Sequence, residues 1–137
     1  MSGDLTAGDY SLKKGRVSLN IPITDAFATR TSVSITDRDG FSKNLLNGQD
    51  LDDMSSVSAR TDWEYMGSAA SVRVFAQYFD AGNNGAAMKG IDDLTPNPRE
   101  LMQDTEANFE LTSKLAAAIL EVPLKNSTNL EVVGSST

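Results

Sequence analysis

Cysteine and histidine are both absent from this chain of 137 residues. Their absence excludes a disulfide framework, a thiolate nucleophile, a zinc-finger site and an imidazole base. A hydroxyl nucleophile would need a lysine or a carboxylate as its base. The sequence contains no G-x-S-x-G elbow, no Walker loop and no G-x-G-x-x-G motif. We therefore expect a protein that is not an enzyme, with no catalytic residues, cofactor or metal ion.

Long apolar runs are also lacking. No run approaches the roughly 18 residues of a membrane-spanning helix, and the first residues lack the apolar core of a signal peptide. Apolar residues make up 39% of the chain, which is slightly lean for a globular protein. These features predict no membrane contact and a location inside a cell or in a particle assembled there. A lean core also fits a chain that buries surface against further copies.

Positive charge is scarce, because 12 Lys and Arg face 19 Asp and Glu for a net charge of −7. An acidic body disfavours broad phosphate contacts, so nucleic acid is not expected as a dominant partner. The basic segment of Lys13, Lys14 and Arg16 beside Tyr10 has two interpretations. It could form a small anionic or nucleic-acid contact, or it could be a strand edge that lysines protect from pairing. We favour the edge.

The first two thirds of the chain predict strands separated by turns. Residues 17–23 and 32–36 alternate apolar and polar side chains, the pattern of half-buried strands. Asp37 to Gly40 predicts a hairpin turn, with residues 41–46 as the returning strand. A loop with one helical turn is expected over 47–58, a strand around Trp63 and Tyr65, and a short helix over 86–94. Residues 71–79 carry apolar groups on both faces, which predicts a strand that is central or is covered by the helix and a partner. Residues 129–133 predict a last strand.

One long helix is expected over residues 98–122. Asn97 suits the N-cap, Pro98 the first helical position, and Pro123 the end. Apolar side chains then fall on one face at helical spacing, and 115–120 is apolar nearly all round. Such a helix is buried on more than one side, so a second copy of the chain could cover it. The residues predicted to form this oligomer interface are Phe109, Leu115, Ala116, Ile119 and Leu120.

Together these elements predict an α+β fold, an antiparallel sheet packed against one C-terminal helix. Residues 1–137 are expected to form a single domain, with an extended arm over about 1–12 and a short tail over about 134–137. A first, loose strand is the alternative for residues 1–12. This layout of a sheet followed by a C-terminal helix loosely resembles the coat proteins of single-stranded RNA phages. The net charge of −7 suits an RNA-lined shell poorly.

The densest carboxylates are Asp37 with Asp39, and the group of Asp50, Asp52 and Asp53. Calcium takes six to eight oxygens, often from alternating acidic side chains in a loop. The full D-x-D-x-D-G spacing and its closing Glu are missing here. We therefore favour a turn and a solvated acidic loop over a cation site.

The function expected from the sequence is a structural subunit that assembles with itself through sheet edges, the helix face and the termini. A coat, cement or tail protein of a phage virion, assembled in the host cytoplasm beside other virion proteins, fits this profile. One alternative is a monomeric acidic module or inhibitor that binds a basic protein surface. A second is a calcium-dependent binding module built on the Asp-rich loops. The prediction for assembly is that Leu120→Asp abolishes it.

Overall fold

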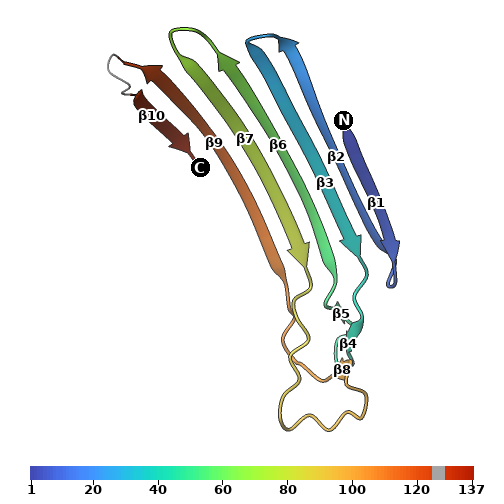
Figure 1. Ribbon diagram of the computed structural model, residues 1–137. Helices are drawn as coiled ribbons and strands as arrows, with labels where there is room; N and C mark the ends of the chain where they lie inside the picture. Colours follow the sequence, from blue (N-terminus) through green and yellow to red (C-terminus); the bar gives the residue numbers. More distant parts are fainter. Residues whose placement is uncertain (125–128) are drawn as a thin grey trace.

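The computed structural model describes residues 1–124 and 129–137 and shows an all-β chain. Seven antiparallel strands form one curved layer in the order β1-β2-β3-β6-β7-β9-β10, with the two chain ends on opposite edges (Figure 1). Their bounds are Ser2–Gly8 (β1), Leu12–Thr24 (β2), Phe27–Arg38 (β3), Met54–Met66 (β6), Ser71–Asn83 (β7), Phe109–Pro123 (β9) and Asn129–Ser136 (β10). The described residues include no α-helix, and so none that could cross a membrane.

The large sheet is built by pairing strands that are near neighbours in the sequence. β3 pairs with β6 over the whole of its length, from Phe27 opposite Tyr65 to Arg38 opposite Met54. β6 with β7, and β7 with β9, continue in the same way without a register shift. Alternating side chains point to opposite faces of a sheet, so this continuous register sorts each strand into two sets.

A smaller mixed sheet lies at one end of the large one (Figure 1). It contains β4 (Ser42–Asn44), β5 (Asp50–Leu51) and β8 (Glu100–Leu101), in the order β5-β4-β8. Here Leu51 and Leu101 are almost completely buried, and the side chain of Asn44 is hydrogen-bonded to the backbone of Leu46 and Gln103. The best-buried core of the described chain is therefore in this small sheet.

The predicted helix over 98–122 is wrong, and the α+β fold class with it. Asn97 does behave as a capping residue, since its side chain accepts from Arg99 N at 3.0 Å and its carbonyl from Glu100 N at 3.1 Å. The turn goes no further, because β8 follows and then β9. β9 pairs with β7 on one side and β10 on the other, and these two long ladders outweigh the weak helical preference of its alanines.

Two other predicted helical segments are also wrong, the turn within 47–58 and the helix over 86–94, because neither is helical. The predicted hairpin at Asp37 to Gly40 is wrong as well, because β3 pairs with β6, and β4 belongs to the small sheet. The strands predicted at 17–23, 32–36, around Trp63 and Tyr65, at 71–79 and at 129–133 are confirmed within β2, β3, β6, β7 and β10. The central position predicted for 71–79 is confirmed too.

Candidate functional site

The large sheet has one face that carries apolar side chains on all seven strands, which we call the apolar face. Its charged side chains lie towards the end next to the small sheet and are Lys13, Asp37, Asp80, Glu110 and Lys114. The registers place its side chains opposite one another from edge to edge. The large apolar ones are Leu5, Val17, Leu19, Ile21, Phe27, Val33, Ile35, Val57, Trp63, Tyr65, Val72, Val74, Tyr78, Leu120, Val122, Leu130 and Val132. A soluble sheet of one layer normally packs such a face against another layer.

The apolar face is open to solvent in the single chain. Trp63 is 49% exposed and Val74 is 44% exposed, although both lie on strands that are paired on each side. A hollow of about 380 Å³ lies between them, lined also by Tyr65 and Val72. A contiguous apolar surface of this kind marks an interaction site.

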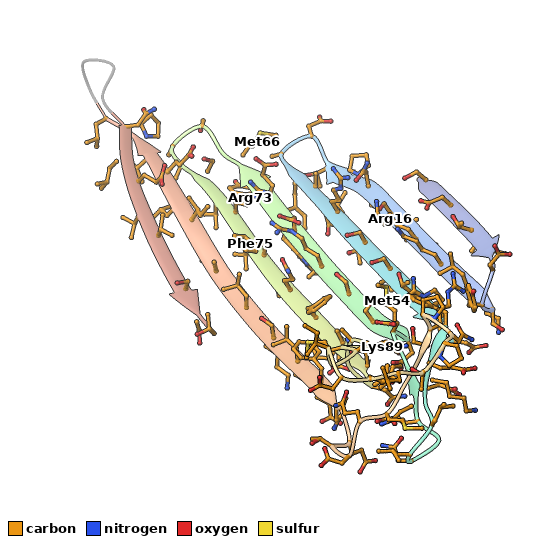
Figure 2. All side chains as sticks on the ribbon, turned by 90° about the horizontal axis from the view of Figure 1, so that it is seen from below. Arg16, Met54, Met66, Arg73, Phe75 and Lys89 are labelled. Carbon is orange, nitrogen blue, oxygen red and sulfur yellow. The ribbon has the colours of Figure 1, made fainter. Side chains whose placement is uncertain are left out.

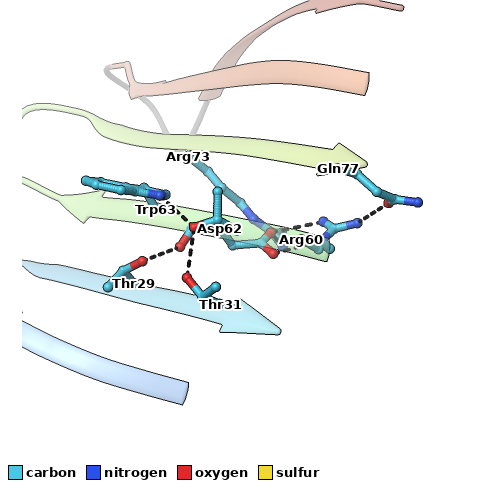
Figure 3. Close-up of polar contacts among 8 residues, drawn as sticks. Thr29, Thr31, Arg60, Asp62, Trp63, Arg73 and Gln77 are labelled. Atoms are coloured by element: carbon cyan, nitrogen blue, oxygen red, sulfur yellow. Dashed lines mark hydrogen bonds and ion pairs between the residues drawn. The ribbon is translucent and has the colours of Figure 1, made fainter. Parts of the chain in front are cut away.

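The few polar side chains in the middle of the apolar face already have partners. Trp63 Nε1 donates to Thr61 Oγ1 at 2.8 Å, and the hydroxyls of Thr61 and Thr31 are 3.0 Å apart. Thr29 Oγ1 donates to the carbonyl of Asp62 at 3.0 Å (Figure 3). This part of the face could therefore be covered without leaving these polar groups unpaired.

The opposite face of β2, β3, β6 and β7 is polar, and we call it the polar face. At its centre Arg60 grips Asp62 through two hydrogen bonds of 2.8 and 3.0 Å, and Arg73 reaches the same carboxylate at 2.8 Å (Figure 3). The Arg60 guanidinium also lies 4.5 Å from the centre of the Phe75 ring. These contacts lower the pKa of Asp62 to about 2, chiefly through the hydrogen bonds from Arg60.

The five predicted interface residues do not share one face. Ala116 and Leu120 lie on the apolar face, where Leu120 stands between Val72 and Val132. Phe109, Leu115 and Ile119 lie on the other side of β9, because strand neighbours alternate. The structure therefore separates a set that helical spacing had united.

The Asp-rich loops use their carboxylates within the chain. Asp52 accepts hydrogen bonds from Ser42 Oγ and Ala87 N, and Asp53 accepts one from Asn84 N at 2.7 Å. Asp50 faces Lys43 at 3.7 Å, while Asp37 lies on β3 and Asp39 follows it. Within residues 1–124 and 129–137, no group of three or more such side chains is placed to hold a metal ion.

The strand edge predicted for the basic segment is wrong, because β2 pairs with β1 on one side and β3 on the other. The alternation of β2 also divides the segment between the two faces of the sheet. Lys14 and Arg16 lie on the polar face, whereas Lys13 lies on the other. Tyr10 sits in the turn before β2, where its ring is tilted at 53° to the ring of Phe41 with the centroids 5.6 Å apart, and its hydroxyl accepts a hydrogen bond from Arg99. Arg30, Arg60 and Arg73 were not predicted from the sequence, and they join Lys14 and Arg16 on the polar face from three other strands. The alternation of polar and apolar residues around each of these arginines indicates that it lies on the polar side of its strand. Only the strand order shows that these polar sides are next to one another.

Comparison with known proteins gives no relative, since no family model, curated protein or solved structure matches the chain.

Proposed function

We propose that this protein is a structural subunit that assembles with itself, and that a second copy of the chain covers the apolar face. The supporting observation is the surface area. The chain exposes 9693 Å², whereas a compact monomer of 14.7 kDa is expected to expose about 6,900 Å².

The excess of about 2,800 Å² slightly exceeds what each chain of a large permanent interface buries. Obligate interfaces bury about 2,000–5,000 Å² in total, or about 1,000–2,500 Å² from each partner. Two sheets stack face to face about 10 Å apart when both inner faces are apolar. A two-fold pair made through the same face of each copy would meet this need, because each copy supplies the layer that the other lacks.

The sheet edges offer further contacts. Among residues 1–124 and 129–137, β1 and β10 each pair on one side, so their outer backbone groups are open to another strand. The predicted helix face cannot serve as an assembly contact, because its residues form strand β9. A coat, cement or tail protein of a phage virion stays a prediction from composition, as do the absence of catalysis and the cytoplasmic assembly.

Leu120→Asp tests this proposal, with Leu111→Asp as the matched control. Both leucines lie on β9 and are partly exposed, at 37% and 46%, but they point to opposite faces. An unpaired carboxylate buried between two sheets costs several kcal/mol, so Leu120→Asp should weaken association by at least about 100-fold. Leu111→Asp should leave it unchanged.

The measurement is molar mass by light scattering after size exclusion, over a dilution series. A wild-type chain that stays monomeric at every concentration would contradict self-assembly and favour the acidic binding module. Equal loss of association in both variants would show that the apolar face is not the interface.

A further inference from the structure

The acidity of the chain lies outside the large sheet. The seven strands carry eight cations, namely Lys13, Lys14, Arg16, Arg30, Arg38, Arg60, Arg73 and Lys114. They also carry eight carboxylates, namely Asp4, Asp37, Asp62, Glu64, Asp80, Glu110, Glu121 and Glu131. The sheet is thus neutral, and the whole net charge of −7 comes from the connections and the small sheet.

Within the sheet, most of the positive charge gathers on the polar face. Six of the eight cations point there from β2, β3, β6 and β7, against the two carboxylates of Asp62 and Glu64 on these strands. On the same side of the sheet, Glu121 and Glu131 lie on β9 and β10, away from Lys14, Arg16 and Arg30. Lys14, Arg16 and Arg30 form no ion pair with any described residue. Asp4 of the edge strand lies opposite Arg16 in register without a salt bridge. This surface therefore has uncompensated guanidinium groups in an otherwise acidic protein.

Hydroxyl groups lie between these cations. Ser18, Ser32 and Arg60 stand in one row across three strands, and Arg16, Ser34 and Ser58 form a second row. A hollow of about 270 Å³ is lined by Arg16, Arg30, Arg60 and these four serines. A larger hollow of about 750 Å³ continues the surface from Arg30 and Arg60 to Arg73. Arginine forks and serine hydroxyls are the donors that phosphate oxygens accept from.

Two aromatic rings border the cations on the same face. Phe75 and Phe79 lie on β7, beside Asp62 and Ser58 of β6 respectively, and both are half-buried. Figure 2 labels Arg16 on β2 at one side of this surface, and Arg73 and Phe75 on β7 at the other. Proteins that bind single-stranded nucleic acid usually combine two features. Cationic side chains contact the sugar-phosphate backbone, and aromatic rings beside them stack on the bases.

We propose that the polar face binds single-stranded nucleic acid, with Lys14, Arg16 and Arg30 on the phosphates and Phe75 and Phe79 beside the bases. The proposal goes beyond self-assembly and uses the opposite face of the sheet. The acidic connections would confine a polyanion to this face by repelling it elsewhere. An assembly would also repeat the site, which strengthens binding to one long strand.

The experiment is a fluorescence anisotropy titration of the full chain with a labelled single-stranded RNA of mixed sequence, between about 50 and 200 mM NaCl. Each phosphate contact to a single strand contributes about 0.7 to the slope of log K against log salt. This slope is negative, because salt weakens binding. The double variant Arg16→Gln with Arg30→Gln should therefore reduce the magnitude of the slope by about 1.4 and weaken binding roughly 20-fold near 0.1 M salt.

Lys14→Gln and Lys13→Gln form the matched pair, since these neighbours lie on opposite faces. Only Lys14→Gln should weaken binding, and circular dichroism should show the same β signal in every variant. No salt-dependent binding by the wild type, or equal losses in the two lysine variants, would overturn the proposal. Equal affinity for duplex RNA would overturn the assignment to single strands. Light scattering measures assembly separately from anisotropy. A failure of assembly through the apolar face is therefore distinguishable from a failure of nucleic-acid binding at the polar face.

Discussion

Asp62 is the residue on which the polar contacts of the sheet converge. Two arginines from adjacent strands share its carboxylate, and Arg60 in turn contacts Gln77 and the Phe75 ring. A guanidinium that binds both carboxylate oxygens holds a fixed geometry as well as a charge. The network therefore ties β6 to β7 on a face that no layer of the described chain covers.

The low pKa of Asp62 predicts a dependence of stability on pH. Its folded pKa of about 2 lies below the ordinary value of 3.8, so the charged carboxylate favours the folded chain. This contribution is complete above about pH 4 and is lost as the pH falls towards 2. Asp62→Asn should lower the free energy of unfolding by about 1 kcal/mol at pH 7, and this deficit should vanish near pH 2.

Urea unfolding of both chains across pH 2 to about 7 measures this difference. Asp25→Asn is the control, because Asp25 lies in the turn between β2 and β3 and forms no salt bridge with the described residues. A deficit for Asp62→Asn that stays constant down to pH 2 would show that the carboxylate acts through its shape rather than its charge.

At the scale of the element, β9 decides the fold class. Its fifteen residues carry the strongest helical pattern of the sequence, yet they pair with strands on both sides. Ala117 is buried at 9% exposure, between Phe75 of β7 and Ser135 of β10. A short side chain suits position 117, because it leaves room for the side chains of the neighbouring strands to lie over β9.

The substitution Ala118→Val should change the free energy of unfolding in opposite directions in a strand and in a helix. Ala118 lies opposite Val74 and Gly134, and the space around Gly134 is open. A β-branched residue packs well on a pleated sheet, so the free energy of unfolding should rise by up to about 1 kcal/mol. In a helix the same change would lower it by up to about 0.7 kcal/mol. Chemical denaturation gives the sign, and a decrease would contradict the strand.

At the scale of the whole molecule, a sheet of one layer leaves two large faces without a covering layer from the described chain (Figure 1). The two faces differ in chemistry, since one is apolar and the other carries uncompensated cations. A protein with this division can join copies through one face and bind a charged polymer through the other. The proposals rest on that division and not on any single residue.

An exposed apolar face also predicts binding of a hydrophobic dye such as ANS. The monomeric Leu120→Asp variant should bind the dye several-fold more strongly than assembled wild-type chain at equal chain concentration, because its apolar face stays in water. Dye fluorescence during dilution of the wild type should rise as the assembly dissociates. Equal and weak fluorescence from both proteins would contradict an apolar face that assembly covers.

Most strands were predictable from the sequence, because alternation is local information. The pattern around Val17, Val33 and Val74 indicates half-buried strands wherever those strands finally lie. Composition likewise determined that no thiol or imidazole chemistry is available. The candidate site was only half predictable: Lys14 and Arg16 stand in one basic segment, but Arg30, Arg60 and Arg73 are far apart in sequence.

The tertiary structure alone decided the state of residues 109–123 and the sorting of charge. An apolar run rich in alanine satisfies both helical and strand periods, so its state depends on whether partner strands are present to complete its hydrogen bonds. Net charge is a sum over the chain, whereas binding depends on where the charges lie. Strand order and register place most of the cations of the sheet on one face, while most carboxylates of the chain lie in the connections; both depend on how separate strands pair.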